Sequence, residues 1–292
     1  MKKNILITFL LFSSFLTKVS ALDITWFGTS CFYLTDGKST LLFDPFLSRV
    51  SLTDIILFRN VKSDPKIVNK WLPAEMRKKI QAIFVTHSHY DHLLDIGEVH
   101  KESYSKVFGS YSTIKIASAS GVKKKFLNKI KINQKIKVGE FEIEVLKGNH
   151  PTHFMNFTLA EGKVDEDFSY PSSALSYKMD EVYSFLIKYK GKTIFLNAST
   201  YPSLTKKRNV DIMIQGLAHA KNYDELITKQ IIPSKTKLVI PSHHDNLFSS
   251  LDKEMEPVVT SDIGLFRKKI KGHSVLLELN IGETKTMIPK LK

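Results

Sequence analysis

Three histidines and one aspartate lie within six positions of the sequence, directly after a short apolar run. The run over residues 82–85 is typical of a buried strand, and the side chains that follow it include His87, His89, Asp91 and His92. Neutral imidazole and carboxylate oxygen are the ligands that a divalent cation such as zinc takes. A group of surface histidines on a polar loop is the alternative, but this spacing favours a metal site at the end of a strand.

The spacing also indicates which of these residues act together. His87 and His89 are separated by one residue, so on an extended backbone both side chains project to the same side. Asp91 and His92 fall on the expected turn into a helix and can face a second position. One cluster can therefore serve two adjacent metals.

The motif over residues 87–92 resembles the metallo-β-lactamase superfamily, and the resemblance extends from about residue 24 to about residue 248. Residues 24–28 and 41–45 are similar to the opening strands of that family. The resemblance implies an α/β fold, the four-layer αββα sandwich, in which two β-sheets pack face to face between helical layers. It also implies a metal-dependent hydrolase whose later ligands come singly from strand ends, and the matching positions are His150 and His243.

The resemblance implies two metal positions. Their expected ligands are His87, His89 and His150 for the first metal, and Asp91, His92 and His243 for the second. The expected cofactor is Zn²⁺, as one or two ions, with Mn²⁺ or Fe²⁺ as alternatives. Asp91 is the expected catalytic residue, because in this geometry it lies beside the bridging water and can orient it or take its proton.

One position departs from the family pattern. The family commonly has an Asp that bridges the two metals after a hairpin strand, whereas this chain has Ser199 after residues 193–197. A neutral hydroxyl is a poor replacement for a carboxylate, so the second metal should bind more weakly. One subclass of the zinc β-lactamases also has Ser there and holds two zinc ions, so a dinuclear site stays open. His244 and Asp245 directly follow His243, and either could supply the missing ligand atom.

Three further residues are candidates for roles around the metals. Asp44 precedes Pro45 and could simply stabilise a turn. The resemblance implies instead that it steadies a metal ligand by hydrogen bonding. His153 lies three positions after His150 and could touch substrate, donate a proton or cap a turn. His219 follows the expected strand over residues 211–215 and could reach the mouth of the pocket or be an ordinary loop histidine.

The expected chemistry is hydrolysis by a metal-bound hydroxide, because metal coordination lowers the pKa of water from about 15.7 to near 7. The sequence contains no Gly-x-Ser-x-Gly elbow and no Gly-rich phosphate loop, so neither serine hydrolysis nor nucleotide binding is indicated. The opening strands and residues 241–244 resemble the broad hydrolase branch of the superfamily, which includes enzymes similar to N-acyl-phosphatidylethanolamine phospholipase D and sugar-lactone hydrolases. A phosphodiester or lipid-like ester is therefore the expected substrate. The alternatives are a β-lactam or lactone hydrolase, and a degenerate metal-binding scaffold without catalysis.

The first 21 residues have the pattern of a secretory signal peptide. A basic opening is followed by an apolar run over residues 5–16 and by Val19, Ser20 and Ala21, which are suited to cleavage. The apolar run is shorter than the roughly 20 residues that a membrane span needs, and an uncleaved anchor is the alternative. We expect one hydrolase domain over residues 22–292, periplasmic or secreted, with no transmembrane span after cleavage. Cys31 is the only Cys, so no internal disulfide is expected.

The chain is strongly basic, with a formal net charge of +14 that falls to +11 when the three lysines of the signal are removed. Seven lysines lie within residues 123–137. Over residues 129–132 and 135–138 Lys alternates with Ile or Val, which is the period of a half-buried strand. A solvated sheet face is the first interpretation, and attraction to anionic surfaces is the second. No base-reading motif is present, so the expected partner is a small-molecule or lipid-like substrate and no specific nucleic acid.

Apolar periodicity and turn residues predict the elements that position these side chains. Residues 46–72 are either an apolar loop that shapes the pocket for a substrate with an acyl portion or a helix packed on the core. Residues 154–180 are a candidate lid, and residues 274–279 and 285–288 are expected to close the outer sheet together. Strands are expected at 24–28, 32–35, 40–44, 82–85, 141–146, 183–189, 193–197, 211–215 and 237–241, and helices at 72–79, 93–100, 222–232 and 262–271.

Overall fold

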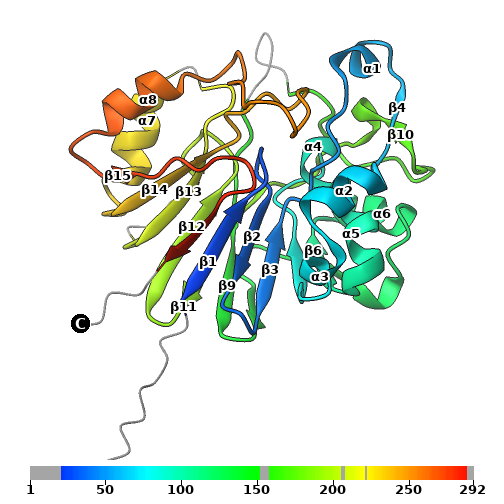
Figure 1. Cartoon of the computed structure of the whole chain (residues 1–292), viewed down its shortest axis with the longest axis horizontal. Helices are drawn as coiled ribbons and strands as arrows, with labels where there is room; N and C mark the ends of the chain where they lie inside the picture. The colour runs from blue at the N-terminus through cyan, green and yellow to red at the C-terminus, as the bar shows by residue number, and fades with distance from the viewer. Residues whose placement is uncertain (1–20, 152–157, 205–207, 221, 288–292) are drawn as a thin grey trace, which may run out of the picture.

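A computed structural model describes residues 21–151, 158–204, 208–220 and 222–287. Within these ranges the chain forms two seven-stranded β-sheets that pack face to face (Figure 1). The first sheet has the order β16 (Thr284–Met287), β1 (Leu22–Trp26), β2 (Phe32–Thr35), β3 (Thr40–Phe43), β5 (Ala82–Phe84), β6 (Lys106–Gly109) and β7 (Leu127–Lys129). The second has the order β15 (Val275–Leu276), β14 (Leu238–Ser242), β13 (Ile212–Gly216), β12 (Lys192–Asn197), β11 (Tyr183–Tyr189), β9 (Phe141–Lys147) and β8 (Lys135–Val138).

The two sheets bury an apolar core between them, because alternate side chains of each strand point to the same inner layer. Phe43 of the first sheet and Phe185 of the second meet there, with ring centroids 5.6 Å apart. Helices cover both outer faces. The first sheet packs against α2 (Pro65–Trp71), α3 (Ala74–Arg77), α5 (Ile96–Ser103) and α6 (Tyr111–Ala119), and the second against α7 (Tyr223–Leu226) and α8 (Ile263–Ile270) (Figure 1).

This arrangement confirms the α/β fold expected from the sequence, with two sheets flanked by helices. Strand direction then determines where the candidate ligands lie. β9 and β12 are both antiparallel to β11, while β13 and β14 run parallel to β12. The carboxyl ends of these four strands therefore share one edge of the second sheet, and His150, Ser199 and His243 follow three of them.

The segment over residues 46–72 contains both a part that lines the pocket and a helix that packs on the core, the two alternatives considered from its sequence. It contains the short helix α1 (Leu52–Ile56), the two-residue strand β4 (Asn60–Val61) and the longer helix α2. α2 packs on the core through the buried Val68, whereas α1 has no fully buried residue and stands at the end of the molecule (Figure 1). β4 pairs with β10 (Ser172–Ser173), which ties this segment to the candidate lid.

Part of the candidate lid lies outside the described residues, since the placement of 152–157 is not described. In the described part, the acidic side chains of Asp165 and Glu166 are held by ion pairs and hydrogen bonds. Glu166 accepts hydrogen bonds from the Tyr111 hydroxyl at 2.5 Å and from Lys115 at 3.0 Å, and Lys178 pairs with Asp165 at 2.6 Å. Lid movement stays a prediction.

Two expectations about elements are wrong. Residues 93–100 are not one helix, because the helical conformation is interrupted between α4 (Tyr90–Leu93) and α5. At this interruption the buried Asp95 carboxylate accepts hydrogen bonds from the backbone of Leu47 and Ser48. The two last strands do not close one sheet either. β15 pairs with β14 and β16 pairs with β1, because the chain crosses between the sheets at a turn where Gly282 N–H donates to the Trp26 carbonyl.

The predicted signal peptide lies outside the described residues for positions 1–20. Across the part of the chain that is described, every helix is too short or too polar to cross a bilayer.

Candidate metal centre

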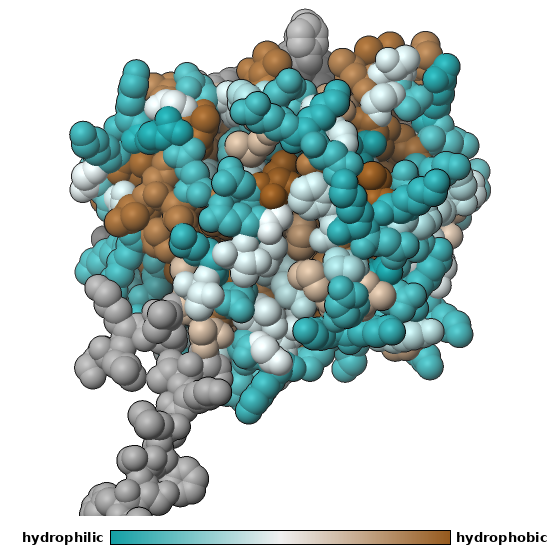
Figure 2. Space-filling model, viewed as in Figure 1, coloured by the Kyte–Doolittle hydropathy of each residue, from teal (hydrophilic) through white to brown (hydrophobic). Residues whose placement is uncertain are grey.

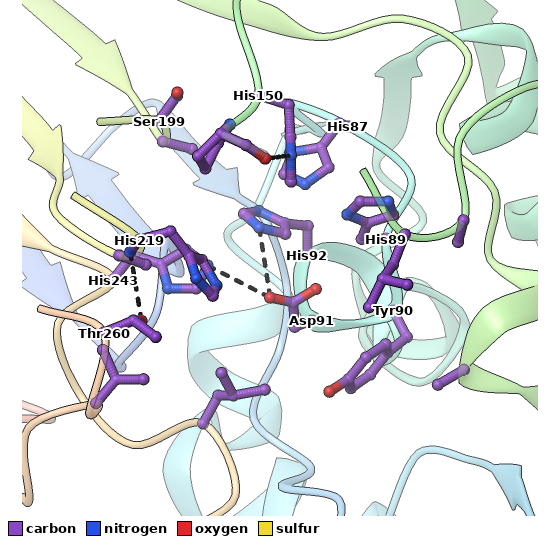
Figure 3. A pocket seen from close by; sticks show the side chains of 18 of the residues that line it. His87, His89, Tyr90, Asp91, His92, His150, Ser199, His219, His243 and Thr260 are labelled. Atoms are coloured by element: carbon purple, nitrogen blue, oxygen red, sulfur yellow. Dashed lines mark hydrogen bonds and ion pairs between the residues drawn. The ribbon is translucent and has the colours of Figure 1, made fainter. Parts of the chain in front are cut away.

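Six side chains from three separate segments converge at one end of the two sheets (Figure 3). They form two groups, and within each group the candidate ligand atoms all lie within 4.8 Å of one another. The first group is His87, His89 and His150, and the second is Asp91, His92 and His243. These are the two sets expected from the sequence, so the predicted convergence is confirmed. That they hold ions stays a prediction.

The end of β5 delivers four of the six side chains because the chain turns there from strand into helix. His89 has extended backbone (φ −66°, ψ 149°) and precedes α4, whose first turn carries Asp91 and His92. The backbone leading into this turn is fixed from the second sheet, since Tyr183 N–H donates to the Thr86 carbonyl at 2.8 Å.

A buried carboxylate determines how the His92 ring is oriented. Asp44 Oδ2 lies 2.7 Å from His92 Nδ1, and the same carboxylate accepts hydrogen bonds from Thr86 N–H and from the Thr86 hydroxyl, each at 2.7 Å. A carboxylate only accepts, so Nδ1 carries the proton. Nε2 is left to face the Asp91 carboxylate at 3.7 Å. Asp44 thus occupies the place expected of a residue that steadies a ligand.

His150 and His243 are oriented by backbone contacts. His150 Nδ1 donates to the Pro151 carbonyl at 2.7 Å, which directs Nε2 toward the first group. His243 follows β14 in a left-handed conformation (φ 52°), and its N–H donates to the Thr29 carbonyl at 2.9 Å. Its Nε2 lies 3.3 Å from Asp91 Oδ2.

The electrostatic environment of His87 and Asp91 favours the protonation states that bind a metal. Burial lowers the pKa of His87 well below its ordinary value, and the neighbouring imidazoles lower it further, so this ring is neutral at pH 7. Burial raises the pKa of Asp91, but the nearby His92 and His243 outweigh it and the net shift is downward. A neutral imidazole and an ionised carboxylate are the forms that coordinate a cation. For His92 the net shift is the opposite: burial lowers its pKa, but the Asp91 and Asp44 carboxylates outweigh burial and raise it.

The first group has a ring nitrogen that a cation would satisfy. His87 is 4% exposed, its Nδ1 lies 3.1 Å from the Thr86 hydroxyl, and its Nε2 is buried with no hydrogen-bond partner among the described residues. Buried polar atoms of this kind are rare because leaving them unsatisfied costs about 1–3 kcal/mol. The residues present therefore fit a metal centre, and a donor set of imidazoles with one carboxylate suits zinc or iron.

Ser199 lies in the turn after β12 and lines the cavity in front of the two groups. It is buried, its N–H donates to Asn197 Oδ1, and its hydroxyl accepts a hydrogen bond from Tyr201 N–H at 3.1 Å. The described ligand groups contain no residue from this turn. The absence of a carboxylate at this place, inferred from the sequence, thus leaves the second group with one carboxylate, Asp91.

His244 and Asp245 do not supply the missing ligand atom, contrary to that alternative. The Asp245 carboxylate accepts from Thr29 N–H at 2.7 Å and pairs with Arg49 at 2.7 Å, and neither His244 nor Asp245 belongs to a described ligand group. The His244 ring stacks on Trp26 with centroids 5.0 Å apart. Both side chains are therefore engaged in holding the loop that carries His243.

His219 and His153 are the remaining candidates from the sequence. His219 lines the cavity, and its N–H donates to the Thr260 hydroxyl at 3.3 Å (Figure 3). His153 lies outside the described residues.

Sequence reasoning missed Arg49, which forms a buried ion pair with Asp245 across 196 positions of the chain. Its side chain is only 4% exposed and also lies 5.0 Å above the Phe46 ring. The sequence carried one weak signal, since Arg is scarce in a chain whose cations are mostly Lys.

The ligand groups open into a cavity of about 450 Å³. Its walls come from α1, from the candidate lid and from the turns after β9, β12, β13 and β14. The cavity places a substrate-sized space directly in front of both groups, as expected of a small-molecule site.

These features define a class of protein: an αββα fold with histidine and aspartate groups at the carboxyl ends of its strands, suited to two metals. Residues 24–154 match the model of the metallo-beta-lactamase superfamily. This part of the chain carries five of the six residues of the two ligand groups, so the match and the site together make the chain similar to metal-dependent hydrolases of that superfamily.

Solved structures extend the likeness of fold over nearly the whole chain. Igni18, a metallo hydrolase from the archaeon Ignicoccus hospitalis, aligns with a TM-score of 0.60 at 16% identity over 92% of this chain and 100% of its own. YhfI from Bacillus subtilis aligns with a TM-score of 0.57 at 16% identity, over the same shares. CmlA, a diiron β-hydroxylase from Streptomyces venezuelae, aligns with a TM-score of 0.53 at 13% identity over 92% of this chain and 54% of its own. A comparison with curated proteins gave no significant match.

Proposed function

We propose that this protein is a metal-dependent hydrolase that cleaves a phosphodiester or a lipid-like ester. The observation that carries the proposal is the convergence of two ligand groups, each within 4.8 Å, at the floor of one cavity. Support for an ester with an apolar portion comes from α1, whose Leu52 and Ile55 line that cavity. β-Lactam or lactone hydrolysis is the second candidate, favoured by the serine at position 199.

His87, His89 and His150 would hold the first metal, and Asp91, His92 and His243 the second. When bound, such a metal pair lowers the pKa of a coordinated water and polarises the scissile carbonyl or phosphoryl oxygen. The ionised Asp91 would accept a hydrogen bond from the attacking water and orient it. Asp44 holds the His92 ring in one tautomer.

A substrate panel tests this function. The purified protein, loaded with zinc, manganese or iron, is assayed on bis(p-nitrophenyl) phosphate, p-nitrophenyl esters, a lactone and nitrocefin. We expect turnover of the phosphodiester or the esters, and loss of the first metal and of turnover in His89→Ala. Turnover of nitrocefin or the lactone alone would move the assignment to the second candidate. Full activity in His89→Ala would contradict the mechanism, and bound metal without any turnover would indicate a binding scaffold.

We also propose that the protein is exported after cleavage of residues 1–21, and that it acts in the periplasm or outside the cell. The apolar run over residues 5–16 and the small residues at 19–21 support this. The net charge of the mature chain would then favour contact with anionic surfaces.

A further inference from the structure

The cavity in front of the ligand groups has an apolar wall. Aliphatic and aromatic side chains from three segments surround it, namely Leu52, Ile55, Leu175, Leu247, Phe248 and Val259. Among the described lining residues there is no Lys, Arg or Glu, and Asp91 of the second ligand group is the one carboxylate. This composition contrasts with a chain whose formal net charge is +14.

Helix α1 supplies one side of this wall and keeps its apolar side chains at the surface. Ser51 caps the helix by accepting a hydrogen bond from Asp54 N–H, and the left-handed Phe58 (φ 52°) ends it one residue after the Leu57 C-cap. Leu52 is 50% exposed although it lines the cavity, so the wall is open to a ligand. Figure 2 shows apolar side chains gathered at the upper right, where Figure 1 places α1.

Val259 lines the cavity from the C-terminal half of the chain and is fully exposed. Leu247 and Phe248 lie a few residues after the ligand His243 and belong to the same apolar cluster as Ile55 of α1, so the wall joins the second ligand group to α1. An extended chain bound along this wall would therefore have one end at the metal groups and would cover side chains that otherwise face water.

We propose that this wall binds an uncharged acyl or alkyl chain, and that the substrate is a lipid-like carboxylic ester that carries such a chain. The proposal rests on the proposed function, since it places the scissile carbonyl at the ligand groups. Each methylene buried against the wall should raise affinity about two- to fourfold, given the usual gain for a buried CH₂. A charge on the chain would find no described counter-ion there and would weaken binding.

Binding and turnover are measured separately, so that the two proposals fail separately. The zinc-loaded protein is titrated calorimetrically with straight-chain alkyl hydroxamates of two to ten carbons, and assayed on p-nitrophenyl esters of the same lengths. We expect hydroxamate affinity and ester kcat/KM to rise two- to fourfold per methylene until the cavity is filled. A carboxylate at the chain end, at a length where the neutral series is still rising, should weaken binding at least tenfold.

Two double variants locate the effect. Leu52→Ser with Val259→Ser removes apolar surface from two sides of the cavity, and the gain per methylene should fall at least by half. Ile56→Ser with Leu57→Ser is the matched control, because both residues are 54–63% exposed in the same helix region and neither lines the cavity. The control should keep the wild-type series, and both variants should keep the wild-type metal content.

The results separate the two proposals. Ester turnover without dependence on chain length, or equal series in the lining variant and its control, would overturn the inference and leave hydrolysis in place. A rising hydroxamate series without turnover of any substrate would support the wall and overturn the proposed function. Preference for the chain that ends in a carboxylate would also overturn the inference.

Discussion

Asp44 illustrates how one buried side chain sets the chemistry of another. Its backbone is left-handed (φ 44°), which places the carboxylate between Thr86 and His92. The Nδ1 proton of His92 is thereby fixed, and Nε2 is presented to the second ligand group. A metal ligand held in this way loses little conformational entropy on binding, which is why such supporting residues affect affinity.

We predict that Asp44→Asn lowers affinity for the second metal by about 10- to 100-fold. Asn tolerates the left-handed backbone, so the change removes the charge and one acceptor with little backbone strain. Competition titration with a chromophoric chelator measures the affinity. Asp95→Asn is the control, since Asp95 is also buried but holds the backbone of Leu47 and Ser48 instead of a candidate ligand. If both variants lose metal affinity equally, removal of any buried carboxylate has this effect, and the specific role of Asp44 in holding His92 is wrong.

Ser199, which stands in place of a carboxylate, is expected to lower the affinity of the second ligand group for its metal. We predict that Ser199→Asp tightens the second metal, because a carboxylate in the cavity beside the ligand groups adds a charged oxygen ligand. Thr260→Asp is the control, because it adds a carboxylate at another position of the same cavity lining. Ser203→Asp is not suitable, since Ser203 is buried and does not line the cavity. If occupancy of the second site rises equally with Asp at 199 and at 260, or does not rise at all, the placement of Ser199 is wrong.

At the scale of elements, the long connection from β12 to β13 is fastened to β9 by an ion pair. Arg208 makes two hydrogen bonds to the Glu144 carboxylate, at 2.6 and 2.9 Å, and both side chains are largely buried. The hydrogen bonds from Arg208 hold the pKa of Glu144 below its ordinary value. A carboxyl whose pKa is lowered by folding stabilises the native state above its unfolded pKa, about 4.3 for Glu, and loses that contribution as the pH falls further.

We therefore predict that Glu144→Gln lowers the free energy of unfolding by about 1 kcal/mol at pH 7, and that the difference from wild type shrinks below about pH 4. Urea unfolding from pH 7 to pH 3 measures both values. Glu142→Gln on the same strand is the control: its pair with Lys188 is 3.8 Å long and exposed, so little change is expected at any pH. A constant difference for Glu144→Gln down to pH 3 would contradict the assigned cause.

Local pattern was enough to predict most elements and the first four candidate ligands. β2 and β11 have the predicted limits, because alternation and turn residues act over a few positions. Features that depend on distant contacts were not predictable in this way. The buried pair of Arg49 with Asp245 joins loops 196 positions apart, and the break before α5 exists because Asp95 is drawn toward the backbone of Leu47. His150 and His243 were placed by resemblance, since their spacing in the sequence carries no local signal.

At the scale of the whole molecule, the predicted cleavage site falls just before the first strand. β1 begins at Leu22, which pairs with Met287 and is almost fully buried. We predict that the exported protein starts at residue 22. Mass spectrometry of periplasmic and secreted fractions identifies the start. An intact N-terminus found only in the membrane fraction would instead indicate an uncleaved anchor.

The centre depends on segments that are distant in the sequence and meet only in the folded chain. β5 and its following turn provide four candidate ligands, while β9 and β14 each contribute one. A metal bound to either group therefore links both sheets. Substitution of a ligand in one group should release the metal of that group and leave the other metal bound.

Elemental analysis of the zinc-loaded protein and two variants tests this account most directly. We predict about two equivalents of zinc per chain for the wild type. His150→Ala should lose the first metal and His243→Ala the second, so that each variant keeps about one equivalent while remaining folded by circular dichroism. Wild-type protein that retains no zinc after loading, or variants that retain as much as the wild type, would contradict the assignment of the two groups as metal sites.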